Sequence, residues 1–398
     1  MEIKYFQNES IKIKGDAVDS KKNMSDDEIN RKYASGEIRI VTEQRRYPLN
    51  TIVSMVSSGQ YILNPDFQRR HRWSKERKSR LIESFIMNVP IPPVFLYETD
   101  YAVYEVMDGL QRITAIYEFY QDKYPLQGLE YWIELEGKYY KDLPLNVKQG
   151  IDRRYLSSVI LLKETARDLE MAALMKKLVF ERLNSGGIKL EYQESRNALY
   201  LGPFNTLTGT LSRNEHFCKI MGIPFQTKET PAFLAKLEMN QTYSTMKDVE
   251  YVVRFFAMRH IDKWESETLN RFLDKFCASA NQLDNSVLTE YHKLFSETIQ
   301  FAYELFGVEA FRIWKKGEDG KLIKRDNRPH TVLYDPLMQV LSQRLDKRQY
   351  YIQNKRQIQK KLKELFEQAP ILSDGRKSFR AELIKQRIQI LDQMFENI

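Results

Sequence analysis

Residues 101–120, YAVYEVMDGLQRITAIYEFY, constrain the fold of this chain more than any other stretch. The apolar run Val103–Met107 predicts a buried strand, and Asp108-Gly109 predicts a turn. Apolar residues then recur at helical spacing, so a helix is expected to begin near residue 110. A strand that passes through glycine into a helix directs free backbone N–H groups and the positive end of the helix dipole at one place. That place suits a phosphate group, and Arg112 can add a bidentate charge.

The same residues also have a purely structural interpretation. Asp108-Gly109 can be only a turn, and Arg112 only a surface charge. For a motif this short the structural interpretation is the commoner one. The choice between the two interpretations therefore depends on the other motifs in the chain.

Length and composition set the class of protein. The chain has 398 residues, of which 42% are hydrophobic, so two domains with packed cores are expected. No apolar run is long enough to span a bilayer, and the stretch MEIKYFQNES lacks an apolar signal core, so we expect a cytoplasmic protein with no membrane partner. Cys218 and Cys277 have no CxxC partner and predict no disulfide framework.

The charge of the chain fits a nucleic-acid partner. The formal net charge is +8 and the pI is about 9.1. One basic cluster surrounds Trp73 and comprises Arg69, Arg70, His71, Arg72, Lys75, Arg77, Lys78 and Arg80. A second comprises Arg344, Lys347, Arg348, Lys355, Arg356, Lys360, Lys361 and Lys363, and we interpret it as a solvated helix face. Trp73 is interpreted as a core anchor.

Hydrophobic periodicity predicts an α+β fold followed by an all-helical region. The expected domains are a weakly ordered arm (1–36), an α+β domain with a small sheet (37–212) and a helical domain (213–398). Strands are expected at 37–42, 94–97, 103–107, 131–135, 139–140 and 159–162. Helices are expected at 49–57, 75–88 with Ser74 as N-cap, 168–183, 191–200, 229–240, 246–263, 266–279, 287–306, 329–345, 350–368 and 376–396, with a charged loop at 315–328.

A second glycine-containing loop follows the helix expected at 168–183. Asn184-Ser185-Gly186-Gly187 ends that helix and precedes the next one. A Gly-Gly loop between two helices can cradle an anion, but more often it only terminates a helix.

Three stretches together resemble a known family. They are PDFQRRHRWSKERKSRLIESFIMNVPIPPVFL, YEVMDGLQRITAIYEF and FERLNSGGIKLEYQESRNALY. In order and spacing they resemble domain-of-unknown-function family 262, found at the N-terminus of GmrSD-type modification-dependent restriction enzymes and of related phage-defence proteins. MKDVEYVVRFFAMR resembles the helical extension of that family. The resemblance implies a ParB/sulfiredoxin-like fold, nucleoside triphosphate (NTP) binding with or without hydrolysis, and action on DNA.

The family signatures map onto particular residues of this chain. The first matches Phe67-Gln68-Arg69, and the second matches Asp108 to Arg112, with Leu110 where the family has glutamine. That departure puts one polar contact to the nucleotide in doubt. The third signature matches Phe180, Arg182, Asn184, Gly186 and Gly187, with Arg196 and Asn197 following.

The resemblance and the residue chemistry together give a candidate site. The nucleotide-binding set is Gln68, Arg69, Asp108, Gly109, Gln111, Arg112, Asn184, Gly186 and Gly187, with Asp108 and Arg112 as candidate catalytic residues. Asp108 either orients Arg112 or holds Mg²⁺; no full metal-ligand set is assigned. Arg70, Arg72, Lys75 and Lys78 are expected to contact DNA.

Other motifs are missing from the sequence. His216, His260, His292 and His330 each lack a second histidine nearby, so no HNH nuclease is expected. No Walker lysine motif occurs, so any NTPase would be ParB-like.

Three functions remain open at this stage. The first is a nucleotide-binding, DNA-associated regulator or sensor in phage defence or restriction. The second is a metal-dependent nickase that uses the Asp108–Arg112 motif, although one carboxylate makes a thin metal site. The third is an interaction module for a partner nuclease. The nucleotide and the oligomeric state are not fixed by the sequence.

Overall fold

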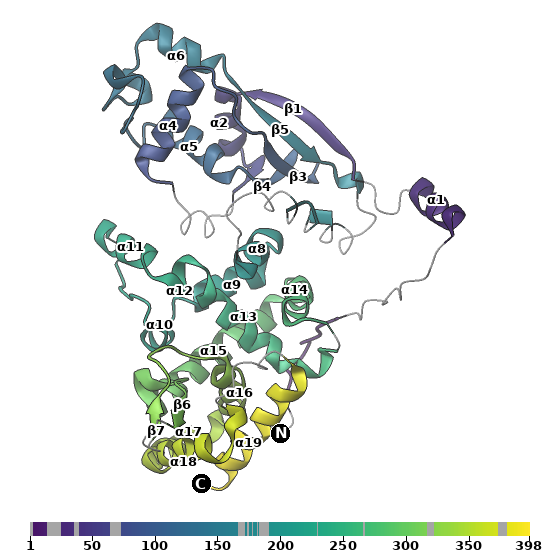
Figure 1. Cartoon of the computed structure of the whole chain (residues 1–398), viewed down its shortest axis with the longest axis vertical. Coiled ribbons are helices and arrows are strands. Elements are labelled where there is room, and N and C mark those ends of the chain that lie inside the picture. Colours follow the sequence, from purple (N-terminus) through teal and green to yellow (C-terminus); the bar gives the residue numbers. More distant parts are fainter. Residues whose placement is uncertain are drawn as a thin grey trace. The chain divides into compact units, whose positions relative to one another are not determined.

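The computed structural model divides the chain into two compact units, residues 18–190 and residues 1–17 with 191–398. It describes residues 3–13, 25–35, 40–63, 73–165, 172, 175–176, 178–180, 182, 191–228, 230–265, 267–316, 322–372 and 380–398 (Figure 1). The expected domain bounds were 36/37 and 212/213. The division falls instead at 190/191, because α8 (Tyr192–Leu199) and α9 (Pro203–Leu211) pack against α13 and α14 of the second unit.

The first unit is built on a mixed five-stranded sheet with the order β1-β5-β3-β4-β2. Its strands are β1 (Thr42–Pro48), β2 (Tyr61–Ile62), β3 (Val94–Asp100), β4 (Val103–Asp108) and β5 (Tyr155–Leu161). β1 and β5 are antiparallel, as are β3 and β4, whereas β3 runs parallel to β5 and β2 parallel to β4. The α+β class with a small sheet is therefore confirmed.

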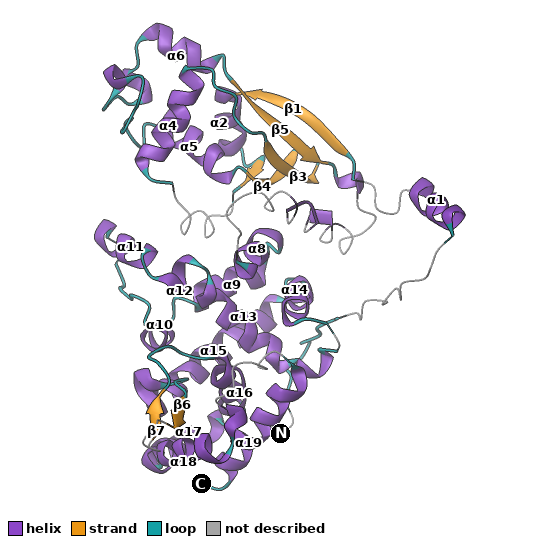
Figure 2. Cartoon of the chain, in the orientation of Figure 1, coloured by secondary structure: helices purple, strands orange, loops and turns teal. Residues whose placement is uncertain are grey.

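Helices cover one face of this sheet (Figure 2). They are α2 (Leu49–Ser57), α4 (Lys75–Ile86) and α5 (Leu110–Tyr120), with α6 (Leu145–Asp152) beyond them. Alternate strand residues such as Leu96 and Ile160 join Ile82 and Ile116 in one buried core. Ser74 caps α4 by accepting a hydrogen bond from the Arg77 N–H, which confirms the N-cap read from the sequence.

Two strand predictions in this unit were wrong. Residues 131–135 and 139–140 contain no strand; Ile133–Leu135 and Tyr140–Asp142 are short 3₁₀ helices. Leu135 and Tyr140 pack into or against the core of this unit, whereas Tyr131 and Ile133 are exposed. The strand expected at 37–42 lies partly outside the described residues; among the described ones, β1 begins at Thr42. Its charged residues are tolerated because β1 is an edge strand with one neighbour.

The second unit is helical. Besides α8 and α9 it contains α10 (Glu215–Met221), α11 (Pro231–Glu238), α12 (Gln241–Ser244), α13 (Lys247–Arg259), α14 (Leu269–Ala280), α15 (Asn285–Phe306), α16 (Thr331–Ser342), α17 (Arg348–Gln353), α18 (Lys355–Gln368) and α19 (Ala381–Glu396). Each helix expected after residue 228 has a counterpart here. The charged loop expected at 315–328 is partly wrong, because β6 (Trp314–Lys316) and β7 (Leu322–Lys324) pair as an antiparallel hairpin. None of the described helices has the length and apolar character needed to cross a bilayer.

Residues 3–13 pack onto the helical unit, although a weakly ordered arm was expected there. Ile11 is only 2% exposed and belongs to the helical core. The Lys12 N–H donates to Ser279 Oγ over 2.8 Å, and the Tyr5 hydroxyl donates to the Arg259 carbonyl over 3.0 Å. Burial of apolar groups offsets the conformational entropy that this segment loses when it packs against the helices.

A buried carboxylate holds this segment in place. Glu9 accepts hydrogen bonds from Arg259 at 3.0 and 3.2 Å and from the Tyr291 hydroxyl at 2.8 Å, and its Oε1 lies 3.0 Å from His260 Nε2. Burial alone would raise the pKa of Glu9, but the hydrogen bonds from His260 and Arg259 outweigh it and lower the pKa to about 2.

Glu9→Gln should destabilise the helical unit by about 3–5 kcal/mol, because it leaves the buried Arg259 guanidinium without its counter-charge. Chemical denaturation at neutral pH measures this, with the exposed Glu238→Gln as control. The ordinary glutamate pKa is 4.5 and the folded value is about 2, so the contribution is full above pH 4.5 and is lost as the pH falls toward 2. A variant whose stability matches that of the wild type at pH 7 would contradict this assignment.

Candidate functional site

The candidate site is the turn between β4 and α5. In the β3–β4 pair Phe95 lies opposite Asp108, and Leu96 lies opposite Val106, so Met107 is an extra residue in β4. Such a bulge redirects the strand, and bulges are common beside functional sites. Helix α5 then begins at Leu110 with Gly109 as its N-cap, which confirms the helix start read from the sequence.

Gly109 is required by both backbone and packing. Its φ is +92°, a region that residues with a side chain rarely adopt. A Cβ atom at this position would lie 2.4 Å from Val94 Cγ1 and 2.9 Å from Val94 Cβ. The turn therefore brings the start of α5 against β3 more closely than any other residue would allow.

Arg112 fastens this turn to the start of β3. Its Nη2 donates to Asp108 Oδ2 over 2.7 Å, and its Nη1 donates to the Pro92 carbonyl over 2.5 Å and to the Pro93 carbonyl over 3.3 Å. The Arg112 side chain is 13% exposed, whereas that of Asp108 is 42% exposed. The guanidinium thus carries its positive charge at the rim of the turn while two carbonyls and a carboxylate fix its plane.

Gln111 offers an unused donor beside it. Its Oε1 accepts from the Trp73 N–H over 3.2 Å, which fixes the orientation of the amide. Its Nε2 is buried and has no hydrogen-bond partner among the described residues. A buried donor without any partner costs about 1–3 kcal/mol, so Gln111 Nε2 is a candidate to donate to a ligand.

The backbone N–H groups at the start of α5 are further hydrogen-bond donors at this turn. Gly109 is the N-cap of α5 and has no side chain to accept from the helix, and its carbonyl accepts only the Ile113 N–H. The first N–H groups of the helix, from residue 110 to residue 112, make no hydrogen bond within the described part of the chain. A helix start with free N–H groups is a place where an anionic oxygen group can bind.

Several expected site residues lie outside the described residues. They are Gln68, Arg69, Arg70, Arg72, Asn184, Gly186 and Gly187. The structure therefore brings together the Asp108, Gly109, Gln111 and Arg112 part of the expected set. Asp108 is placed to orient Arg112, which was one of its two expected roles.

The two described DNA-contact candidates differ. Lys75 is exposed in the first turn of α4. Lys78 is 8% exposed, and its Nζ donates to Glu118 Oε2 over 2.6 Å. The expectation that Lys78 contacts DNA does not fit this geometry, because its charge is already paired inside the fold. Helix periodicity could have shown this, since Lys78 lies one turn before the buried Ile82.

A buried ion pair lies on the other face of the sheet, and sequence reasoning missed it. Lys176 Nζ lies 2.5 Å from Glu105 Oε2 and 4.7 Å from the centre of the Tyr97 ring. Burial raises the pKa of Glu105, while Lys176 opposes that shift. The signal was a glutamate in the middle of the apolar strand β4, which needs a partner when buried. The pair ties the segment preceding the Gly-Gly loop to the strand that carries Asp108.

Arg196 follows that loop in the family signature. Its side chain makes its hydrogen bonds within the helical unit. Its guanidinium donates to Asp274 at 2.8 Å, to Gln193 at 2.7 Å and to Asn270 at 2.8 Å. Its side chain is 2% exposed. These bonds join α8 to α14.

The described residues were also considered as ligands for a metal ion. No group of three or more histidine, cysteine, aspartate or glutamate side chains is placed to hold a metal ion in that part of the chain. At the turn, Asp108 would have to share a cation such as Mg²⁺ with oxygen atoms supplied by a ligand.

Gly109→Ala should destabilise the first unit by about 2–4 kcal/mol, the sum of backbone strain and the clash with Val94. Gly137→Ala is the matched control, because Gly137 has φ +78° and a Cβ added there would meet no atom within 4 Å. That control should lose only the strain, about 1 kcal/mol. Equal losses in denaturant titrations of the two variants would show that the close approach to β3 is not important.

Comparison with known proteins gives one finding. Residues 49–201 match the family model described as the GmrSD restriction endonuclease, N-terminal domain. No curated protein matches the chain, and no solved structure matches it. The match begins at α2, includes the β4–α5 turn and ends just after α8, so residues 49–201 are similar to the N-terminal domain of the GmrSD restriction endonuclease, which supports the resemblance to domain-of-unknown-function family 262 expected from the motifs.

Proposed function

We propose that this protein is a nucleotide-binding regulator of a restriction system that acts in phage defence. The family match supports the restriction-system role. The observation that carries the nucleotide proposal is the buried Gln111 Nε2, which has no hydrogen-bond partner among residues that the structure describes, next in sequence to the uncapped start of α5 and the fixed guanidinium of Arg112. The ligand class is a nucleoside triphosphate, bound through its phosphates.

The donors match a phosphate in charge and direction. Backbone N–H groups at the start of α5 supply dipole and hydrogen bonds, and Arg112 supplies a full positive charge. Asp108 already neutralises part of that charge at 2.7 Å. A phosphate therefore either displaces the carboxylate from Arg112 or binds with Mg²⁺ between itself and Asp108. The second arrangement predicts that Mg²⁺ strengthens binding.

DNA is the second proposed partner. Lys75 and Arg77 are exposed on the first turns of α4, and the sequence before this helix carries Arg70 and Arg72. Arg77 lies 4.6 Å from the centre of the Trp73 ring. The Trp73 N–H also donates to Gln111, so Trp73 connects this basic surface with the proposed phosphate site. Nucleotide binding would thus alter DNA affinity through Trp73.

The alternative function, a metal-dependent nickase, would require more metal ligands at this site. A metal-dependent nuclease needs several oxygen ligands and usually two cations. Among the described residues, the turn offers Asp108, and that carboxylate is engaged with Arg112. We therefore place nucleotide binding ahead of cleavage.

Arg112→Ala should weaken NTP binding about 10- to 150-fold, because it removes a charged contact worth about 1.5–3 kcal/mol. Titration calorimetry with and without Mg²⁺ measures the effect, with the exposed Arg153→Ala as control. Gln111→Glu keeps the acceptor for the Trp73 N–H but replaces the donor with a negative charge, so it should also abolish binding. Wild-type affinity in both variants, with folding intact, would overturn the site.

Lys75→Ala should weaken DNA binding and lower the slope of log affinity against log salt by about 0.9, the effect of one lost phosphate contact. Lys78→Met should leave that slope unchanged and reduce stability instead, because it leaves Glu118 without its partner. Fluorescence anisotropy over a salt series separates the two effects. A slope that falls for Lys78→Met and not for Lys75→Ala would reverse the assignment.

A further inference from the structure

The positive charge of this chain is concentrated in one part of the helical unit. Residues 311–380 contain 18 lysine and arginine residues and 8 aspartate and glutamate residues, a formal charge of +10. The whole chain carries +8, so the other 328 residues together carry −2. Residues 18–190, the first unit, contain 27 lysine and arginine residues and 24 aspartate and glutamate residues, a formal charge of only +3. The strongest attraction for a polyanion is therefore expected on the helical unit.

Part of this charge is paired within the fold. Three cations of the stretch contact carboxylates that lie outside it, namely Lys324 with Glu309, Arg348 with Glu304 and Arg344 with Asp392. Without these three cations, residues 311–380 still carry a formal charge of +7. The excess is thus not consumed by these ion pairs, and its place on the surface becomes the question.

Helix α18 carries a basic face made of Arg356, Lys360 and Lys363. The three residues recur at helical spacing, so they lie on one side of the helix, and all three are exposed. Within the described part of the chain, Arg356 and Lys363 form no ion pair. Lys360 lies 3.8 Å from Glu364, but both side chains are exposed, and such a pair contributes little. Glu367 lies one turn beyond Lys363, so the basic face ends there.

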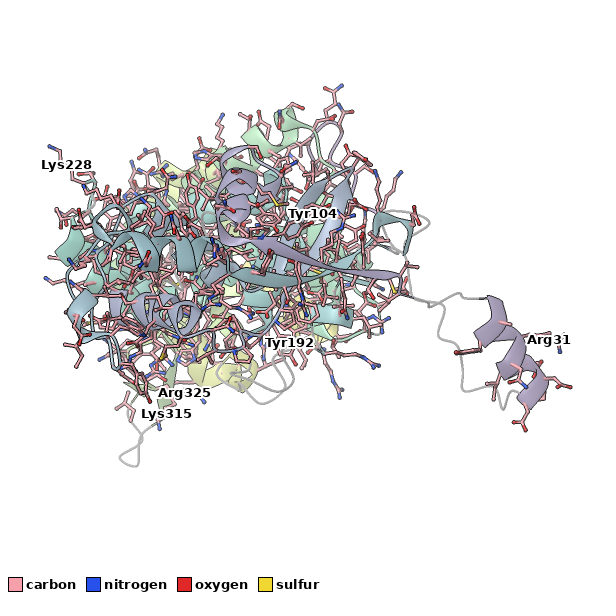
Figure 3. All side chains as sticks on the ribbon, turned by 90° about the horizontal axis from the view of Figure 1, so that it is seen from above. Arg31, Tyr104, Tyr192, Lys228, Lys315 and Arg325 are labelled. Carbon is pink, nitrogen blue, oxygen red and sulfur yellow. The ribbon has the colours of Figure 1, made fainter. Side chains whose placement is uncertain are left out.

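The β6–β7 hairpin adds positive charge next to α18. Lys363 Nζ lies 4.6 Å from the centre of the Trp314 ring, so the helix and the hairpin are in contact (Figure 1). Lys315 and Arg325 are exposed on the same hairpin (Figure 3). The basic face thus continues from two turns of one helix toward a second element of the helical unit.

The packing of α18 favours a nucleic acid over a membrane surface as the polyanion. A helix that lies in a membrane surface buries its own apolar side in the lipid. The apolar side of α18 consists of Ile358, Leu362 and Phe366, which are buried in the core of the helical unit. What α18 offers to a partner is therefore charge alone. Lysine and arginine side chains on such a face contact phosphates, and these contacts carry no base-sequence information.

We propose that the basic face of α18 binds the phosphate backbone of duplex DNA without regard to base sequence. This site is separate from Lys75 and Arg77 of the first unit, and the proposal rests on the proposed function only in taking DNA as a partner. It gives the second basic cluster a binding role, where the sequence alone indicated a solvated helix face.

Fluorescence anisotropy of a labelled duplex, titrated with the full chain over a salt series, tests the proposal. Arg356→Gln combined with Lys360→Gln and Lys363→Gln should lower the slope of log affinity against log salt by about 2.7, because each lost phosphate contact removes about 0.9. Two duplexes of unrelated sequence should give the same result. The matched control replaces three other exposed lysines of the helical unit with glutamine and should leave the slope unchanged; these are Lys236, Lys247 and Lys293.

An unchanged slope in the variant of the basic face would overturn the proposal. Equal falls in this variant and its control would also overturn it, because net charge alone would then explain the binding. So would a wild-type chain that binds no DNA at low salt; if it bound phosphatidylserine vesicles through the same three residues, the face would belong to a membrane surface. Titration with NTP separates this proposal from the nucleotide site, since the basic-face variant should keep the wild-type NTP affinity. A wild type that binds DNA through this face but no NTP would contradict the nucleotide proposal and support this one.

Discussion

The guanidinium of Arg112 is the interaction on which the candidate site depends. It joins the carbonyls that precede β3 to the carboxylate that ends β4, and it does so from the first turn of α5. Gly109 makes this possible, because only a glycine lets the helix start so close to Val94. Three elements of the first unit therefore meet at one fixed charge. A site built in this way is rigid before any ligand arrives, which lowers the entropy lost on binding.

The same geometry supports the proposal that the site binds an anion. A fully paired arginine would be only a structural clamp, but here the carboxylate of Asp108 is 42% exposed and can be shared with a cation. Gln111 keeps a buried donor without a partner in the described structure, and the helix start keeps N–H groups without acceptors. Each is unfavourable in isolation. The proposed phosphate would supply acceptors for them.

Local sequence signals predicted the local features well. The Asp108-Gly109 turn, the Ser74 cap and the long helices each depend on neighbouring residues, and the structure confirms them. Features that depend on distant partners could not be predicted. Residues 3–13 pack through Glu9, whose partners lie some 250 residues away, and Lys78 pairs with Glu118 across two helices. The loop at 131–135 resembles a strand in composition, but Glu83 fixes its backbone from α4.

Hydrogen exchange of backbone amides is the most direct test of the central claim, that the start of α5 binds phosphate. The measurement compares residues 110–112 in the free protein and after addition of ATP or GTP with Mg²⁺. The account predicts that one of these nucleotides slows exchange at these amides, because their N–H groups acquire acceptors, while the exposed Tyr101 turn is unchanged. Unchanged exchange at residues 110–112, with a nucleotide shown to be bound by calorimetry, would place the nucleotide elsewhere and contradict the account.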